Sequence, residues 1–361
     1  MANYKNQHFV PRCYLKPFTQ DREGRALNLY NLDAARSIPR VSARDQCSGD
    51  YFYGDDLKLE KRLQPFEASY GQLLDRIQGE NYRLNADDRT ELRRFWLLQH
   101  LRTEAASRRT VEMFDQLEAD AGEIPQGYRT NIKDAVKQAM SVFFDTPDLL
   151  DDLSVCLVRN TTDRSFITSD NPAVMGNRWH QSDRRAIGVS PGLQNAGMVG
   201  LLPLSPEILC LIYDGDLHTL PNVAGWVNAD RTADIDALNA HQVLNCAANL
   251  YFAGWSDRTG VETLVAETAG RRLPARFAIH HAVLDRIEDG AEVFKVVPAA
   301  EARLAARSIV HSEALLPTPQ RWPSILRWRT GGRVYDSGTA EGFVRDSHPD
   351  AKQFRRLRVR P

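Results

Sequence analysis

The chain has 361 residues, of which 42% are hydrophobic and 26% are charged, and its formal net charge is −1. This composition is ordinary for a soluble globular protein, and the length is sufficient for one large domain or two closely joined domains. The balanced charge excludes a global attraction to nucleic acid or to a membrane surface. Any nucleic-acid site would therefore have to be a local patch.

Cysteine usage and hydropathy indicate the cell compartment. The five cysteines are scattered and form no Cys-x-x-Cys pair, so neither a disulfide framework nor a zinc ribbon is indicated. The N-terminus lacks the apolar core of a signal peptide, and no run approaches the roughly 18–20 apolar residues that a membrane span needs. We expect a cytoplasmic protein with no membrane partner.

The first organised stretch is residues 6–18, which we call the N-terminal segment. Its apolar side chains need a surface to cover, and burying them would also draw in Gln7, His8 and Arg12. Buried polar side chains need hydrogen-bond partners. The N-terminal segment is therefore either a structural plug or one wall of a site. The apolar residues are Phe9, Val10, Tyr14, Leu15 and Phe18.

Hydrophobic spacing predicts one strand and then a run of helices. Alternation over Ala26–Leu32 is typical of a half-buried strand. From Leu57 the apolar residues recur every three or four positions, which predicts a helix to Ile77, and Asp87 and Asp88 open a second helix that includes Leu101. Two more helices are expected over residues 108–121 and 132–144. We expect these helices to form a layer over residues 57–146.

After Pro147 the pattern changes to that of strands. Residues 153–158 and 165–168 predict a β-hairpin, residues 208–213 a further strand, and residues 233–248 a helix with Asp230 or Thr232 as its cap. The fold class expected is α+β, with the N-terminal helical layer packed on a mostly antiparallel β-sheet. Residues 1–255 would form the core domain, with its sheet in residues 150–255. Residues 256–361 would form a peripheral region with a basic end.

Several short motifs in the first two-thirds of the chain resemble a known family. The N-terminal run Gln7-His8-Phe9-Val10-Pro11-Arg12 and the run Thr168-Ser169-Asp170-Asn171-Pro172 carry most of this resemblance. The chain thereby resembles domain-of-unknown-function family 4238, which is mainly bacterial. The resemblance implies no chemistry, and a defence or stress role is the expectation that it adds. Further matches, in order, are Tyr14-Leu15-Lys16, Phe18, Leu59-Glu60, Glu67, Gln99, Arg102-Thr103, Phe166-Ile167, Pro203-Leu204-Ser205-Pro206, Asn239 and Gln242.

The sequence departs from the family pattern in two places. Cys13 stands where a bulkier side chain is expected, and residues after about Leu250 match nothing in the pattern.

Asp170 and His8 are the first candidate site residues. Asp170 stands where a strand gives way to a loop, and strand ends often carry reactive side chains because the sheet holds the backbone rigid. The alternative is that Asp170 and Asn171 make local hydrogen bonds in an Asx-turn. His8 is a candidate general base, metal ligand or buried hydrogen-bond hub.

Glu67 lies beside the apolar stripe of the first helix, which also leaves two interpretations open. Glu67 can form an ion pair with Arg102, which projects from the second helix together with Gln99. Alternatively, Glu67 and Asp170 bind a divalent cation, with His8 as third ligand or base. No cofactor or metal is specified by the sequence, although a divalent metal is compatible with this triple.

Standard nucleotide, hydrolase and zinc-protease motifs are absent from the sequence. Three classes of function therefore stay open. The first is a structural or interaction protein, whose polar residues satisfy one another in a helix–sheet interface. The remaining two involve a ligand or substrate. One is a binding protein for nucleic acid or a phosphate-containing ligand, contacted by Arg12, Gln99, Arg102 and Asn171. The other is a metal-dependent hydrolase, plausibly a nuclease, with His8, Glu67 and Asp170 as catalytic residues. In both cases we expect these side chains to converge on one polar pocket.

Overall fold

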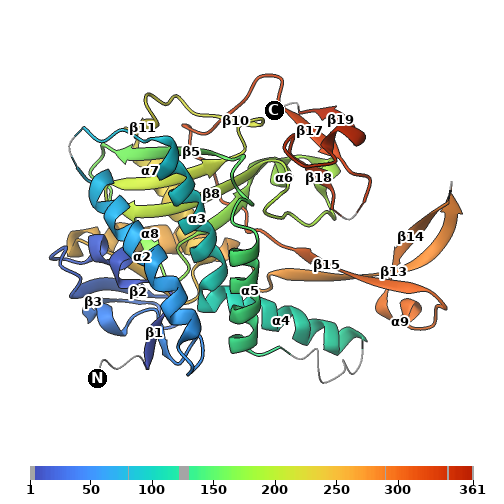
Figure 1. The fold of residues 1–361 in the computed structure, drawn as a ribbon, viewed down its shortest axis with the longest axis horizontal. Coiled ribbons are helices and arrows are strands. Elements are labelled where there is room, and N and C mark those ends of the chain that lie inside the picture. The colour runs from blue at the N-terminus through green and yellow to red at the C-terminus, as the bar shows by residue number, and fades with distance from the viewer. Residues whose placement is uncertain (1–4, 80, 122–129, 289, 340, 360–361) are drawn as a thin grey trace.

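The structure is a computed structural model that describes residues 5–79, 81–121, 130–288, 290–339 and 341–359. It confirms a mixed α+β fold, in which helices pack with several β-sheets (Figure 1). Among the described residues, no helix combines the length and the apolar character needed to cross a lipid bilayer.

The four helices predicted between residues 57 and 146 are present. Side chains of Asn85 and Asn131 cap two of them, because each accepts a hydrogen bond from a backbone N–H three residues further on, at 2.8 and 3.0 Å. The four helices are α2 (Lys58–Ile77), α3 (Ala86–Arg102), α4 (Glu104–Ala121) and α5 (Ile132–Asp145).

The larger sheet has five strands in the order β11-β5-β9-β8-β7. All neighbouring pairs are antiparallel except β11 and β5, which are parallel. Every residue of β8 and β9 is buried, so both faces of the sheet are covered. The strands are β5 (Ser154–Asn160), β7 (Val174–Asn177), β8 (Met198–Ser205), β9 (Ile208–Tyr213) and β11 (Trp226–Ala229).

A second, antiparallel sheet has four strands in the order β3-β2-β12-β6. It contains the predicted strand near residue 26, here β2. The strands are β2 (Ala26–Asn31), β3 (Arg36–Ser42), β6 (Thr168–Ser169) and β12 (Asn249–Phe252).

The predicted hairpin of residues 153–158 and 165–168 is wrong, because β5 and β6 belong to different sheets. The backbone N–H of Phe166 donates to the carbonyl of Pro206 at 2.8 Å, and that of Ile167 donates to Asn239 Oδ1 at 3.1 Å. Phe166 and Ile167 therefore form hydrogen bonds with these distant partners and not with β5. Residues 161–167 connect the five-stranded sheet to the four-stranded sheet.

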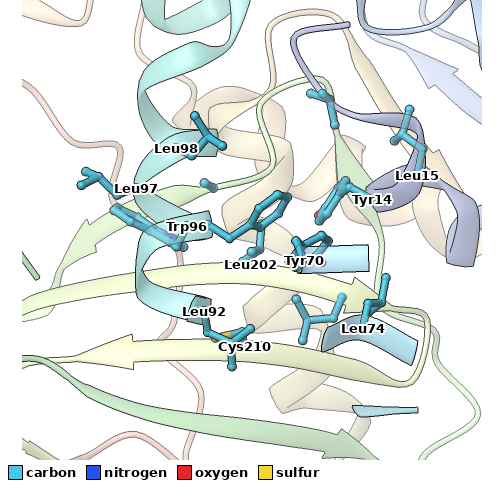
Figure 2. Close-up of a cluster of buried hydrophobic side chains, with 14 of the residues drawn as sticks. Tyr14, Leu15, Tyr70, Leu74, Leu92, Trp96, Leu97, Leu98, Leu202 and Cys210 are labelled. Carbon is cyan, nitrogen blue, oxygen red and sulfur yellow. The ribbon is translucent and has the colours of Figure 1, made fainter. Parts of the chain in front are cut away.

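Two hydrophobic cores cover the two faces of the five-stranded sheet. One combines residues of α2, α3 and the N-terminal segment with inward residues of β5, β8 and β9, and Figure 2 shows its centre around Tyr14, Tyr70 and Trp96. The other joins the opposite face to helix α7 (Thr232–Asn245) and to Ile325 and Leu326. The sheet is thus held between helices from different parts of the chain.

The N-terminal segment is buried as predicted. It comprises strand β1 (Asn6–His8), which pairs with β4 (Ser48–Asp50), and the short helix α1 (Arg12–Leu15). Its five apolar side chains, Phe9, Val10, Tyr14, Leu15 and Phe18, are each at most 5% exposed.

Residues after 256 begin with helix α8 (Arg258–Thr268) and continue into a three-stranded arm. The arm extends away from the larger sheets in Figure 1 and consists of β13 (Phe277–Glu288), β14 (Ala291–Val297) and β15 (Ser308–Ala314), with helix α9 (Ala299–Ala302). Five of its large apolar side chains are exposed: Ile287, Val296, Leu304, Ile309 and Val310. The division into domains at residue 255 stays a prediction.

Arg355, Arg356 and Arg358 of the basic end lie in β19, and Arg360 lies outside the described residues. The small antiparallel sheet that contains them is formed by β17 (Arg333–Asp336), β18 (Phe343–Val344) and β19 (Arg355–Arg358). Further short elements are helix α6 (Arg178–Ser182) and the antiparallel pair β10 (His218–Thr219) and β16 (Arg327–Trp328).

Candidate functional site

Arg102, at the end of α3, contacts two other sequence-predicted site residues, His8 and Glu67. Its buried guanidinium donates through Nη2 to Glu67 Oε1 and to the backbone carbonyl of His8, both at 2.7 Å, and through Nε to the hydroxyl of Tyr53 at 2.8 Å. A buried arginine needs such partners because an unpaired charge in a protein interior is strongly destabilising. The ion pair considered for Glu67 is therefore present, and it fastens the N-terminal segment to α2 and α3.

The side chains of His8 and Arg12 lie at the edge of this cluster. His8 Nε2 is 2.9 Å from the carbonyl oxygen of Arg44, so this nitrogen carries the proton. Burial lowers the pKa of His8, and the positive charges of Arg12 and Arg102 lower it further. Arg12 itself is exposed. The imidazole of His8 thus bonds to the backbone, and only its carbonyl contacts Arg102.

Gln99 lies one turn before Arg102 and is fully buried. Neither its Oε1 nor its Nε2 has a hydrogen-bond partner among the residues that the structure describes, and the same holds for Nη1 of Arg102. Buried amides are normally bonded. Several hydrogen-bond donors and acceptors around Gln99 and Arg102 therefore have no partner among the described residues.

Asp170 and Asn171 lie in a second polar group, around the end of α7. The Asp170 carboxylate accepts hydrogen bonds from the backbone N–H groups of Ala247, Ala248 and Asn249, each at 2.8 Å. Burial raises the pKa of Asp170, and these three bonds act in the opposite direction. In this arrangement Asp170 holds the loop between α7 and β12.

The neighbouring family-motif residues bind one another in the same group. Ser169 Oγ donates to Gln242 Oε1 at 2.7 Å, and Gln242 Nε2 donates to the carbonyl of Pro172 at 2.9 Å. Asn239 binds the backbone of Ser165 and Ile167. The two motifs, far apart in sequence, therefore lock α7 against β6.

The described residues contain no group of three or more His, Cys, Asp and Glu side chains that could hold a metal ion. His8, Glu67 and Asp170 each have the separate partners given above. The metal-dependent hydrolase, with His8, Glu67 and Asp170 as its catalytic residues, stays a prediction.

Asn171 connects the two polar groups and lines a pocket. Its Oδ1 accepts from the hydroxyl of Thr103, the residue after Arg102, at 2.9 Å, and its Nδ2 donates to the carbonyl of Asn245 at 2.9 Å. Beside it lies a pocket of about 180 Å³. The pocket is bounded by the end of α3, by α4, by residues 171–175, by the end of α7 and by the base of the arm, where Phe277 pairs with Ala314.

Two arginines line this pocket, Arg109 on α4 and Arg276 just before β13. Burial lowers the pKa of Arg109 to about 10, and the charge of Arg276 adds to the effect. Arg276 donates to the carbonyl of Leu244 at 2.7 Å and to Asn245 Oδ1 at 3.3 Å, both at the end of α7. Within the described residues neither arginine forms an ion pair. The exposed carboxylate of Glu112 raises the pKa of both arginines, against the effect of burial.

His100 is the third titratable side chain of the pocket. Its ring stacks on Trp96 with a centroid distance of 4.7 Å and an interplanar angle of 10°, and its Nδ1 is 3.0 Å from the carbonyl oxygen of Ala173. Burial lowers the pKa of His100 to about 4, and the charge of Arg109 contributes. The imidazole is therefore neutral at physiological pH.

Sequence reasoning selected Asn171 but missed His100, Arg109 and Arg276. The first and last of these residues, His100 and Arg276, are 176 positions apart, and no local motif joins the three. The available signals were weak ones: His100 lies between Gln99 and Arg102, and Arg276 follows the basic pair Arg271-Arg272.

Comparison with known proteins identifies the family. The family model described as "Protein of unknown function (DUF4238)" matches residues 6–254, and the chain belongs to this family. No curated protein and no solved structure matches the chain. The match covers both polar groups and the His100 and Arg109 side of the pocket, whereas Arg276 and the base of the arm lie beyond it.

Proposed function

We propose that this protein binds a small phosphate-containing ligand in the pocket lined by Arg109 and Arg276. The observation that carries the proposal is that two guanidinium groups share one partly buried pocket without a carboxylate ion pair among the described residues. Like charges brought together out of water repel each other, and a bound anion relieves this repulsion. Arginine also matches the geometry of phosphate oxygens with two parallel N–H donors.

The size of the pocket favours a small ligand over a nucleic-acid strand. Its volume of about 180 Å³ lies below the roughly 300–1,000 Å³ of pockets that hold drug-sized ligands. The walls are largely apolar, with Val174, Met175 and Leu315 among them. Such walls exclude water and strengthen the attraction between the arginines and an anion.

The motif residues give this pocket a rigid frame. Thr103 and Asn245 fix both ends of the Asn171 amide, and Arg276 is held on the end of α7. Arg102 and Gln99, which we predicted as ligand contacts, lie on the other side of Thr103, so in this proposal they position the pocket wall. We place this binding activity in the cytoplasm, and a defence or stress role stays an expectation from the family resemblance.

The proposal is tested by calorimetric titration of the protein with inorganic phosphate. Replacing Arg109→Gln should weaken binding at least about tenfold, since a charge-assisted hydrogen bond contributes roughly 1.5–3 kcal/mol. Arg108→Gln is the matched control, because Arg108 is the exposed neighbour on α4 and pairs with Glu104. Equal affinities for wild type and Arg109→Gln would refute the proposal, and tighter binding of succinate would reassign the pocket to carboxylates.

A further inference from the structure

We propose that the pocket selects a phosphate group that still carries a proton, because His100 presents a hydrogen-bond acceptor beside the two arginines. This inference rests on the proposed function and adds the chemical form of the ligand. It concerns the same pocket but a different side chain from those that attract the anion.

The contact with Ala173 determines which ring nitrogen of His100 is protonated. A backbone carbonyl oxygen only accepts hydrogen bonds, so the Nδ1 atom 3.0 Å away must be the donor. In a neutral imidazole the other nitrogen, Nε2, then has a free lone pair and accepts. Among the described residues, the hydrogen bond that His100 makes is the one between Nδ1 and the carbonyl oxygen of Ala173, and none involves Nε2.

The ring is also held in one orientation. It stacks on Trp96, whose indole Nε1 donates to the carbonyl of Leu201 at 3.2 Å. With one face on Trp96 and one edge on Ala173, the imidazole cannot turn its N–H toward the pocket without losing the hydrogen bond to Ala173. Since His100 lines the pocket and Nδ1 is bonded to Ala173, we infer that Nε2 is the acceptor that the ring presents to the pocket.

A second proton on His100 is disfavoured by the same surroundings. It would place a third positive charge beside Arg109 and Arg276 in a partly buried site. The burial that lowers the pKa of His100 to about 4 acts in the same direction. His100 therefore stays an acceptor across the physiological pH range.

These three side chains together distinguish between anions of equal shape and charge. The arginines offer donors to the charged oxygens, whereas Nε2 of His100 requires a donor from the ligand. Hydrogen phosphate has one hydroxyl and supplies it. Sulfate at neutral pH has only acceptor oxygens, so one of them would face the Nε2 lone pair and leave it unpaired, which is the strongest means by which a binding site rejects an analogue.

The test compares inorganic phosphate with sulfate at mildly alkaline pH, where both are divalent. Calorimetric titration of the wild-type protein should give at least about tenfold tighter binding of phosphate. In His100→Phe, which keeps a ring on Trp96, this preference should fall to near unity, mainly through weaker phosphate binding. His311→Phe is the control, because His311 lies on β15 outside the pocket.

The outcomes separate this inference from the proposed function. Equal binding of phosphate and sulfate by the wild type would overturn the role of His100 and leave the anion pocket intact. A preference that persists in His100→Phe would also overturn it. Failure of both anions to bind would overturn the proposed function itself. The wild-type comparison decides the matter even where His100→Phe does not fold.

Discussion

At the scale of single residues, the structure distinguishes two roles for the family motifs. Most motif side chains bind other motif side chains or backbone groups, as Ser169 does with Gln242 and Glu67 does with Arg102. Asp170 is the clearest case, since both of its oxygens are occupied by backbone N–H groups. Gln99 and Nη1 of Arg102 are exceptions, because they have no hydrogen-bond partner among the described residues. In the pocket, the side chains with unused hydrogen-bonding capacity are Arg109 and His100, which are not motif residues.

Asp170→Asn tests whether this carboxylate is structural. An amide has one oxygen and one NH₂ group, so at least one of the three backbone N–H groups would meet a donor in place of an acceptor. We expect the free energy of unfolding to fall by roughly 2–4 kcal/mol, because an unmet buried donor costs about 1–3 kcal/mol and a charge-assisted bond is also lost. Urea unfolding followed by circular dichroism measures this.

The control for this change is Asp163→Asn, an exposed aspartate seven residues earlier. That variant should unfold within about 0.5 kcal/mol of the wild type. An Asp170→Asn protein that unfolds like Asp163→Asn would show that the three hydrogen bonds contribute little, and would return Asp170 to the list of candidate reactive residues.

At the scale of secondary structure, elements with a strong local pattern were predictable and elements defined by distant partners were not. The four helices from α2 to α5 and strand β9 follow from hydrophobic spacing alone. The hairpin at residues 153–168 failed because Phe166 and Ile167 bond to Pro206 and Asn239, which no local pattern reveals.

The pocket could not be predicted from the sequence for the same reason. Its titratable side chains come from α3, α4 and the residue before β13, and only the packing of these elements brings them together. Local propensity says nothing about such packing. What the sequence did indicate was the polar character of the Gln99–Thr103 turn and of Asn171, which adjoin the pocket.

The N-terminal segment is the element whose removal should have the largest effect. Its five apolar side chains are almost fully buried, and the hydroxyl of Tyr14 donates to the carbonyl of Pro203 at 2.6 Å and lies 2.7 Å from Thr168 Oγ1. Each large apolar side chain contributes roughly 1.5–3 kcal/mol on burial. A protein lacking residues 1–18 should therefore lose most or all of its cooperative thermal transition.

Tyr14→Phe gives a milder form of this test that retains the fold. It removes only the hydroxyl and leaves two buried oxygens unpaired, so we expect a loss of about 1–2 kcal/mol in the free energy of unfolding. Tyr51→Phe is the control, because Tyr51 is 36% exposed. A truncated protein that melts like the full chain would contradict the structural role of the whole segment.

At the scale of the whole molecule, buried titratable groups predict how stability depends on pH. Burial lowers the pKa of His100 and His241 to about 4 and that of His218 to about 3. In the unfolded chain, histidine takes up a proton near pH 6.5. Between about pH 4 and 6.5 the unfolded chain therefore binds more protons, and stability falls as the pH falls.

Asp214 acts in the opposite direction. Burial raises its pKa to about 6, whereas an unfolded aspartate titrates near roughly 3.9. Below pH 6 the folded protein gains a proton there that the unfolded chain does not, so this group stabilises the fold as the pH falls. Among the groups with the largest pKa shifts in this range, three histidines against one aspartate leave a net loss of stability on acidification.

We expect the free energy of unfolding to be roughly 4 kcal/mol lower at pH 5 than at pH 7, the sum of the three histidine contributions less that of Asp214. Urea titrations at the two pH values measure it. His241 contacts Trp322 and does not itself line the pocket. His241→Phe should therefore reduce the difference by roughly 2 kcal/mol, the share of one histidine. Equal stability at pH 5 and pH 7 would mean that these histidines do not remain neutral in the fold, and the acceptor role of His100 would fall with that result.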